Sequence, residues 1–167
     1  EEALPVYTSH EFGGSNWIID SGATQHMIFE KDCLSDYVEF KQPCVVNLGD
    51  NCSILVYGKG NYRIKAVVDD HIQPLCLRDV LYLPELEKNL LSVCAMIKLG
   101  ATVLFEDGFV KIICNSKLLA TGVMRGKLYV LKMLIPDEQL NVAERSSSLQ
   151  LWHYRLGHLG RSEERRV

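Results

Sequence analysis

The pentapeptide Asp20-Ser21-Gly22-Ala23-Thr24 follows the apolar run Trp17-Ile18-Ile19, and this junction constrains the fold more than any other feature of the sequence. The apolar run predicts a buried β-strand, which places the carboxyl group of Asp20 at the strand's end. Gly22 permits a tight turn beneath that carboxyl group, because glycine adopts backbone angles that other residues avoid. Ala23 is small enough to let a second loop approach. The junction therefore predicts a strand that presents one carboxylate on a tight loop.

Short β-type runs separated by turn residues fill most of the remaining chain, and this pattern is typical of a mainly β domain. Turn signals at Gly49-Asp50-Asn51, Glu106-Asp107-Gly108 and Met124-Arg125-Gly126-Lys127 predict hairpins. Between the first strand and these runs, we expect a loop or one short helical turn over residues 30–37. The expected strands cover residues 44–48, 54–57, 62–68, 75–83, 102–105, 109–113, 118–123 and 128–134.

One helix is expected, over residues 90–99. Apolar side chains recur there at helical spacing, and Gly100 is placed to cap the C-terminus of the helix. Residues 1–16 are polar and without periodicity, so we interpret them as a linker whose last part adds an edge strand. Residues 135–148 carry few large apolar side chains and predict a second linker.

The chain has 167 residues, 47% of them hydrophobic, and a net charge of −3. This composition is typical of a globular protein with one full domain and part of a second. The slight acidity argues against a nucleic-acid-binding surface in the main domain. The chain begins at Glu1 rather than Met, which we interpret as a processed product or a piece of a longer protein.

The six cysteines show no Cys-x-x-Cys spacing, and several lie in apolar runs, where a thiol behaves as a small hydrophobe. This usage favours a reducing compartment over a disulfide framework. No apolar stretch reaches the roughly 18 residues that a membrane span needs, and no basic segment precedes an apolar one at the N-terminus. We therefore expect an intracellular protein, cytoplasmic or inside virus-like particles, with no membrane partner.

Six motifs, taken together, resemble a retropepsin, and more closely the protease of copia-type retrotransposon polyproteins. They span residues 17–160 in order. The resemblance implies a closed β-barrel acid-protease fold with one short helix and one catalytic loop per chain, over residues 17–134, with a C-terminal β-hairpin extension from about residue 109. The motifs are Trp17-Ile-Ile-Asp-Ser-Gly-Ala-Thr-Gln-His26, Val56-Tyr-Gly-Lys-Gly60, Leu77-Arg-Asp-Val-Leu-Tyr-Leu-Pro84, Lys88-Asn-Leu-Leu-Ser-Val93, Gly126-Lys-Leu-Tyr-Val-Leu131 and Leu151-Trp-His-Tyr-Arg-Leu-Gly-His158.

The resemblance further implies an aspartic endopeptidase that processes its own Gag-Pol polyprotein and works as a homodimer, because each chain supplies one catalytic aspartate. Asp20 takes that role, Ser21 is its hydrogen-bond partner across the dimer, and Gly22, Ala23 and Thr24 complete the loop. Proteolysis by this chemistry needs no cofactor. The tip of a flap over bound peptide falls on Leu48, Gly49, Asp50 and Asn51.

The residues expected to pack beneath the catalytic loop are Leu90, Leu91 and Ser92. Retroviral proteases usually have two apolar residues and a glycine here, whereas copia-type sequences commonly look like this one. Ser92 therefore makes the packing beneath Asp20 the point at which the match to retroviral proteases is weakest.

Two C-terminal histidines, His153 and His158, are five residues apart and resemble the first half of the His-His-Cys-Cys zinc module that opens retroelement integrases. A structural zinc site needs four protein ligands, and no Cys-x-x-Cys follows before Val167. We interpret residues 149–167 as the start of that module, with zinc as a candidate ligand of an incomplete site. His10, His26 and His71 have no partner spacing, so we expect polar or packing roles for them.

Two other interpretations remain open. Asp20-Ser-Gly-Ala-Thr24 also resembles the phosphate loop of sugar kinases and actin-like ATPases, but those folds need two such lobes and a longer chain. More serious is a catalytically inactive or domesticated retroelement domain, kept as a dimerisation or interaction module. Concentration-dependent cleavage that an aspartic-protease inhibitor blocks would separate this alternative from the enzyme.

Overall fold

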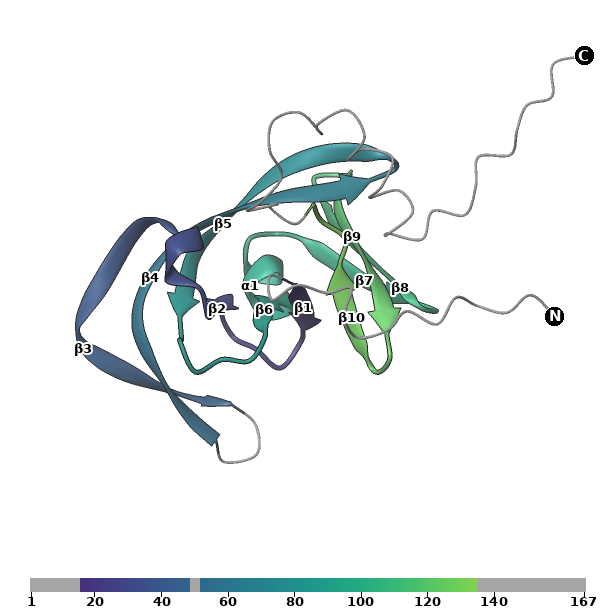
Figure 1. The fold of residues 1–167 in the computed structure, drawn as a ribbon. Coiled ribbons are helices and arrows are strands. Elements are labelled where there is room, and N and C mark those ends of the chain that lie inside the picture. The colour runs from purple at the N-terminus through teal and green to yellow at the C-terminus, as the bar shows by residue number, and fades with distance from the viewer. Residues whose placement is uncertain (1–15, 49–51, 135–167) are drawn as a thin grey trace, which may run out of the picture. The chain divides into compact units, whose positions relative to one another are not determined.

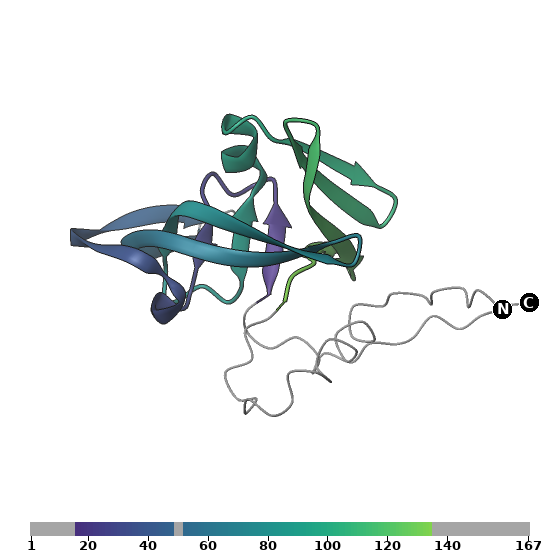
Figure 2. The ribbon, with the colours of Figure 1, turned by 90° about the horizontal axis from the view of Figure 1, so that it is seen from above.

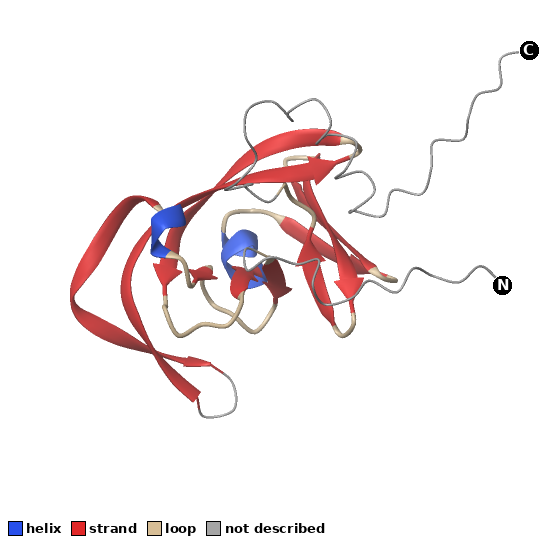
Figure 3. Ribbon diagram, viewed as in Figure 1, coloured by secondary structure: helices blue, strands red, loops and turns tan. Residues whose placement is uncertain are grey.

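The apolar run at residues 17–19 forms the expected strand, β1, near the middle of one long sheet (Figure 1). The computed structural model describes residues 16–48 and 52–134, all within one compact unit that comprises residues 12–135. Over these described residues the chain is mainly β, as expected, with short helical segments among the strands (Figure 3). The expected linkers at residues 1–16 and 135–148 and the expected zinc module at 149–167 lie outside the described residues, except for Asn16.

Within residues 16–48 and 52–134, strands and two short helical segments follow one another in sequence. They are β1 (Trp17–Asp20), β2 (Met27–Ile28), the 3-10 turn η1 (Lys31–Cys33), β3 (Ser35–Leu48), β4 (Cys52–Val68), β5 (His71–Tyr82), β6 (Asn89–Ser92), α1 (Val93–Lys98), β7 (Thr102–Glu106), β8 (Phe109–Cys114), β9 (Lys117–Arg125) and β10 (Leu128–Leu131).

The described strands form a sheet in the order β3-β4-β5-β2-β6-β1-β10-β9-β8-β7. Strand β1 runs parallel to β6 on one side and antiparallel to β10 on the other. Its Trp17, Ile18 and Ile19 are buried, which explains the unbroken apolar run, since a strand with neighbours on both edges and side chains covered on both faces has no polar side. Asp20 therefore stands at the end of a strand that is held from both sides.

The sheet curls, so that β4 and β5 pass around β1, β6 and α1 (Figure 1). The end of β4 reaches the segment that follows β10. There the backbone N–H of Val67 donates to the carbonyl of Lys132 at 3.0 Å, and the N–H of Leu134 donates to the carbonyl of Lys65 at 2.9 Å. Among the described strands, however, β3 and β7 remain edges of the sheet. The expected closed barrel is therefore not confirmed. The bridge after β10, together with the bond from the Thr121 hydroxyl on β9 to the carbonyl oxygen of Val67, joins β4 to the far half of the curled sheet.

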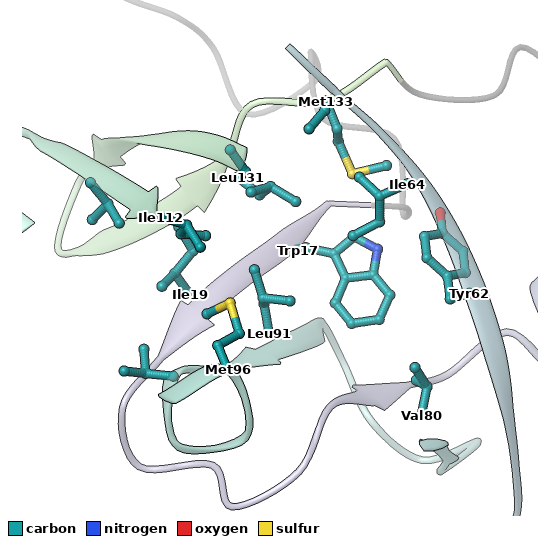
Figure 4. Close-up of a cluster of buried hydrophobic side chains, with 14 of the residues drawn as sticks. Trp17, Ile19, Tyr62, Ile64, Val80, Leu91, Met96, Ile112, Leu131 and Met133 are labelled. Atoms are coloured by element: carbon teal, nitrogen blue, oxygen red, sulfur yellow. The ribbon is translucent and has the colours of Figure 1, made fainter. Parts of the chain in front are cut away.

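The largest core cluster lies around Trp17, whose indole ring is fully buried and 5.0 Å from the ring of Tyr62 on β4. Figure 4 shows Leu91, Ile64 and Met133 near this tryptophan, and Ile19 farther along β1. These residues come from β1, β4, β6 and the segment after β10, so one cluster joins strands that are far apart in the sequence. Its burial fixes β1 against the rest of the domain.

The hairpin that we expected as a C-terminal extension is part of the same sheet. Strand β10 pairs with β1 through Ile18 with Val130 and Ile19 with Tyr129. Seen from above, β3 (blue) lies to one side of β1 (purple), and β7 to β9 (green) lie on the other (Figure 2). Residues 109–131 thus complete the surroundings of the strand that carries Asp20.

The expected helix over residues 90–99 is shorter than predicted. Residues 89–92 form β6, and α1 begins at Val93, because Leu90 and Leu91 pair with β1 in register with Ile18 and Ile19. The C-terminal prediction was better, since Gly100 follows the helix with a φ of +87°. The strands expected at residues 44–48, 54–57, 62–68 and 75–83 are parts of the longer β3, β4 and β5. Within the described ranges, no helix is long and apolar enough to cross a membrane.

Candidate active site

The side chain of Asp20 is held by its own loop. Gly22 donates its backbone N–H to Asp20 Oδ1 at 2.7 Å. A Cβ at position 22 would lie 3.2 Å from that same oxygen, so a larger residue would crowd the carboxylate. A hydrogen bond from a backbone N–H to a carboxylate oxygen restricts the rotamer of the side chain. Gly22, which we expected to permit the tight turn, therefore also orients the side chain of Asp20.

The loop presents one side to solvent and anchors the other. Ser21, Gly22 and Thr24 are exposed and Asp20 is half-buried, whereas Ala23 is only 5% exposed. The exposed hydroxyl of Ser21 and the half-buried carboxylate of Asp20 are thus available to groups outside this chain. The buried Ala23 connects the loop to the residues beneath it.

The three residues expected beneath the loop lie on β6, beside β1. Leu90, Leu91 and Ser92 pair in parallel register with Ile18, Ile19 and Asp20. Leu91 is 2% exposed, and Leu90 is half-buried and also pairs with Met27 on β2. The structure therefore brings these residues together with the Asp20 loop, although they are some seventy positions away in the sequence.

Ser92 makes more contacts than the sequence indicated. Its hydroxyl donates to the carbonyl oxygen of Ala23 at 2.6 Å and accepts the backbone N–H of Ala95 at 3.0 Å, which caps α1. Its own backbone N–H donates to Nδ1 of His26 at 3.0 Å. One fully buried serine thus joins the Asp20 loop, β6 and the first turn of α1.

His26 was expected to have a polar or packing role, and the structure shows which one. Its side chain is 4% exposed, and burial lowers the pKa from 6.5 to about 4. The sequence signal for this contact was weak: a histidine six positions after Asp20, with no spacing that pointed to Ser92. A second buried polar residue, Asn89, accepts the backbone N–H of Phe29 through Oδ1 at 3.2 Å and so holds the chain just after β2.

The expected flap falls on the hairpin of β3 and β4. Leu48 and Cys52 pair at the end of this hairpin, and Gly49, Asp50 and Asn51 lie outside the described residues. A second apolar cluster includes Ile54 and Val56 on β4, and Val46 and Leu48 on β3 pack against this cluster. The hairpin therefore has its own packed base.

The candidate metal ligands His153 and His158 also lie outside the described residues. Across residues 16–48 and 52–134, no group of three or more histidine, cysteine, aspartate or glutamate side chains is placed to bind a metal ion. The Asp-Ser-Gly triplet that begins at Asp20 occurs once in the sequence.

Comparison with known proteins assigns this arrangement to a family. The family model described as "Pol polyprotein, beta-barrel domain" matches residues 17–101, which run from β1 through α1. The chain belongs to the Pol polyprotein beta-barrel domain family. The matched residues of this Pol domain contain Asp20, His26 and Ser92.

Three curated relatives of this Pol domain are proteins of plant retrotransposons. It is 32% identical over 147 residues to the retrovirus-related Pol polyprotein from transposon TNT 1-94 of Nicotiana tabacum, which covers 87% of this chain and 11% of that protein. It is 29% and 28% identical over 152 residues to the Pol polyproteins from transposons RE1 and RE2 of Arabidopsis thaliana, which covers 88% of this chain and 10% of each of them. The chain thus spans about a tenth of the length of these relatives.

These matches confirm the retrotransposon origin that the sequence motifs indicated, and they identify the chain as part of the Pol region of a copia-like element. Strands β7 to β10 lie beyond the residues that the family model matches, although β10 is a direct neighbour of β1. The identity between this chain and its relatives extends over both parts.

Proposed function

We propose that this Pol domain is an aspartic endopeptidase that is active as a homodimer and cuts the polyprotein from which it comes. The observation that carries the proposal is the placement of Asp20. Its carboxylate is oriented by the Gly22 N–H, on a half-exposed loop at the end of a strand with hydrogen-bonded neighbours on both edges. Such a carboxylate is fixed in position and still accessible to a substrate and to a second copy of the loop.

The chemistry follows from bringing two such loops together. Two Asp20 carboxyl groups within a few ångströms of each other do not both ionise readily, so the pair holds one proton and titrates in two macroscopic steps. The ionised member takes a proton from the attacking water, while the protonated member donates to the carbonyl oxygen of the scissile peptide bond. The roles reverse as the amine leaves. We expect activity to peak on the acidic side of neutrality.

The exposed Ser21 is proposed as the hydrogen-bond partner across the dimer, and the small buried Ala23 keeps the loop narrow enough for that approach. An extended peptide would add to the exposed edges of the β-structure through backbone hydrogen bonds. Leu48, Gly49, Asp50 and Asn51 are proposed as the tip of the flap that covers it. Closing the flap would exclude bulk water from the reacting atoms.

The further proposals concern the cell and the rest of the polyprotein. We propose that the domain acts inside the cell, in the cytoplasm or in virus-like particles, without a membrane or nucleic-acid partner. Proteolysis by two aspartates uses no cofactor. His153 and His158 are proposed as the first ligands of a zinc module that opens the next part of the polyprotein, which would need two further ligands to be complete.

The test is cleavage of a peptide library that includes junctions of the element's own polyprotein, at pH 5 and pH 7, over a range of protein concentrations. Asp20→Asn should abolish cleavage. Asp107→Asn, which removes the same charge from the exposed turn between β7 and β8, should leave it unchanged. Activity per chain should rise with concentration up to the dissociation constant of the dimer. No cleavage at concentrations where sedimentation shows a dimer would contradict the proposal and favour an inactive interaction module.

A further inference from the structure

Two buried polar residues lie beneath the Asp20 loop, and a hydrogen bond joins the backbone of one to the side chain of the other. Among the described residues, the buried polar side chains are His26, Asn89 and Ser92. His26 and Ser92 are 66 positions apart in the sequence and belong to different elements. A buried polar group destabilises a fold unless it forms hydrogen bonds. The hydrogen-bond partners of His26 and Ser92 therefore indicate the role of these two residues.

The contact between them fixes the state of the histidine. The backbone N–H of Ser92 donates to Nδ1 of His26 at 3.0 Å. Nδ1 must therefore offer a lone pair, which leaves the proton of the neutral imidazole on Nε2. Hydrogen bonds to His26 also come from β5, where the N–H of Leu81 donates to its carbonyl at 2.9 Å. Neither partner has a titratable side chain, and the ionisable residue in register with Ser92 on β1 is Asp20.

The serine extends the contact to the loop. Its hydroxyl donates at a short distance of 2.6 Å to the carbonyl oxygen of Ala23, three residues after Asp20, and accepts from Ala95 at 3.0 Å. A serine that served only as the helix cap would need only the bond from the N–H of Ala95. Ser92 also bonds to the carbonyl oxygen of Ala23 through its hydroxyl and to Nδ1 of His26 through its backbone N–H. These two bonds hold the two ends of the segment from Ala23 to His26.

We propose that Ser92 and His26 are positioning residues that hold the Asp20 loop in its catalytic geometry through uncharged hydrogen bonds. This inference rests on the proposed proteolytic function. We call this pair the brace. Because the brace is uncharged, it adds no charge that would act on the proton shared by the two Asp20 side chains of the dimer. Because burial keeps the pKa of His26 near 4, the brace stays neutral at the pH values where we expect cleavage.

The first test compares variants that keep or remove the bonds of the brace. Ser92→Ala removes the hydroxyl and Ser92→Thr keeps it. His26→Leu removes the acceptor, whereas His26→Asn offers Oδ1 at the position of Nδ1. We expect Ser92→Ala and His26→Leu to lower kcat by roughly 10²-fold with KM changed much less, since small misplacements of reacting groups have effects of that size. Threonine and asparagine should restore most of kcat.

Rates are compared per folded dimer, so that loss of stability is not counted as loss of catalysis. An active wild-type enzyme in which Ser92→Ala keeps its kcat, or in which Ser92→Thr is as slow as Ser92→Ala, would overturn the inference and leave the proposed function intact. A wild-type dimer that cleaves nothing would overturn the proposed function, and with it the catalytic purpose of the brace.

The second test needs neither activity nor a variant that folds. The ¹⁵N spectrum of the imidazole in the wild-type protein at pH 6 should show neutral His26 with the proton on Nε2 and Nδ1 accepting a hydrogen bond. The amide proton of Ser92 should exchange slowly with solvent. A His26 that is protonated on Nδ1 at this pH, or a Ser92 amide that exchanges as fast as the exposed loop, would refute the brace itself.

Discussion

A methyl group added at Gly122 tests how tightly β1 is held behind Asp20. Gly122 lies on β9, in register with Leu131 on β10. A Cβ there would lie 2.6 Å from Cδ1 of Ile19 and 2.9 Å from the carbonyl oxygen of Val130. Carbon atoms in contact are normally about 3.5–4.0 Å apart, so the isoleucine or the strand must move by about 1 Å. We expect Gly122→Ala to lower the free energy of unfolding by about 1–3 kcal/mol, the usual range for overpacking.

A double-mutant cycle identifies the contact. Ile19→Val removes Cδ1 and should by itself destabilise the domain by about 0.5–1.5 kcal/mol. In the double variant the clash with Cδ1 is gone and the clash with the Val130 carbonyl remains. The two substitutions together should therefore destabilise the domain by at least about 0.5 kcal/mol less than the sum of their separate effects.

Urea unfolding followed by the fluorescence of the buried Trp17 measures these differences, at one fixed protein concentration because self-association changes apparent stability. Additivity within about 0.3 kcal/mol would refute the reasoning, because it would mean that the added methyl group and Ile19 do not meet. A Gly122→Ala variant as stable as the wild type would refute it more directly.

Three further predictions concern the core, the buried histidine and the thiols. Trp17→Ala should lower the free energy of unfolding by about 3–5 kcal/mol, measured by circular dichroism in urea, and a loss below about 1 kcal/mol would contradict the core described above. His26 binds a proton more readily in the unfolded chain, at pKa 6.5, than in the folded one, at about 4, so its contribution to stability is complete above pH 6.5 and is lost as the pH falls towards 4. This pKa shift corresponds to about 3 kcal/mol of stability over that pH range. The free energy of unfolding of His26→Asn should therefore fall less steeply than that of the wild type as the pH is lowered. Identical pH dependence of the two proteins would contradict the lowered pKa of His26. A thiol reagent should modify the exposed Cys44, Cys52 and Cys76 before the half-buried Cys94 and Cys114, as peptide mass spectrometry would show, and equal rates would contradict these exposures.

The turns and the central strand were predictable from the sequence because their causes are local. The apolar run before Asp20 forms β1, and the glycines at positions 108 and 126 have the positive φ angles of +75° and +59° that hairpin turns use. Gly100 ends the helix for the same reason. In each case the backbone angle, or the apolar character of the strand, is set by the residue itself and its nearest neighbours.

The long strand β4 shows where local reasoning failed. We expected two separate strands at residues 54–57 and 62–68, with Gly58 and Gly60 in the gap between them, yet β4 is continuous through both glycines. A Cβ at Gly58 would meet the ring of Tyr37 and lie 2.5 Å from the carbonyl oxygen of Val38. The glycine therefore allows β3 to pack closely against β4 and does not end the strand. The start of α1 was misplaced in a similar way, because Leu90 and Leu91 suit a helix by spacing but are paired with β1.

The strand and tight loop around Asp20, the mainly β character of the domain and, through the motifs, the retrotransposon Pol region could be predicted from the amino-acid sequence. The curl of the sheet, the position of β10 beside β1 and the contact between His26 and Ser92 beneath the loop became visible in the folded domain. These features involve residues that are far apart along the chain. A hydrogen bond between residues 66 positions apart depends on strand order and register, which arise from packing the whole sheet and leave no periodic signal in either segment.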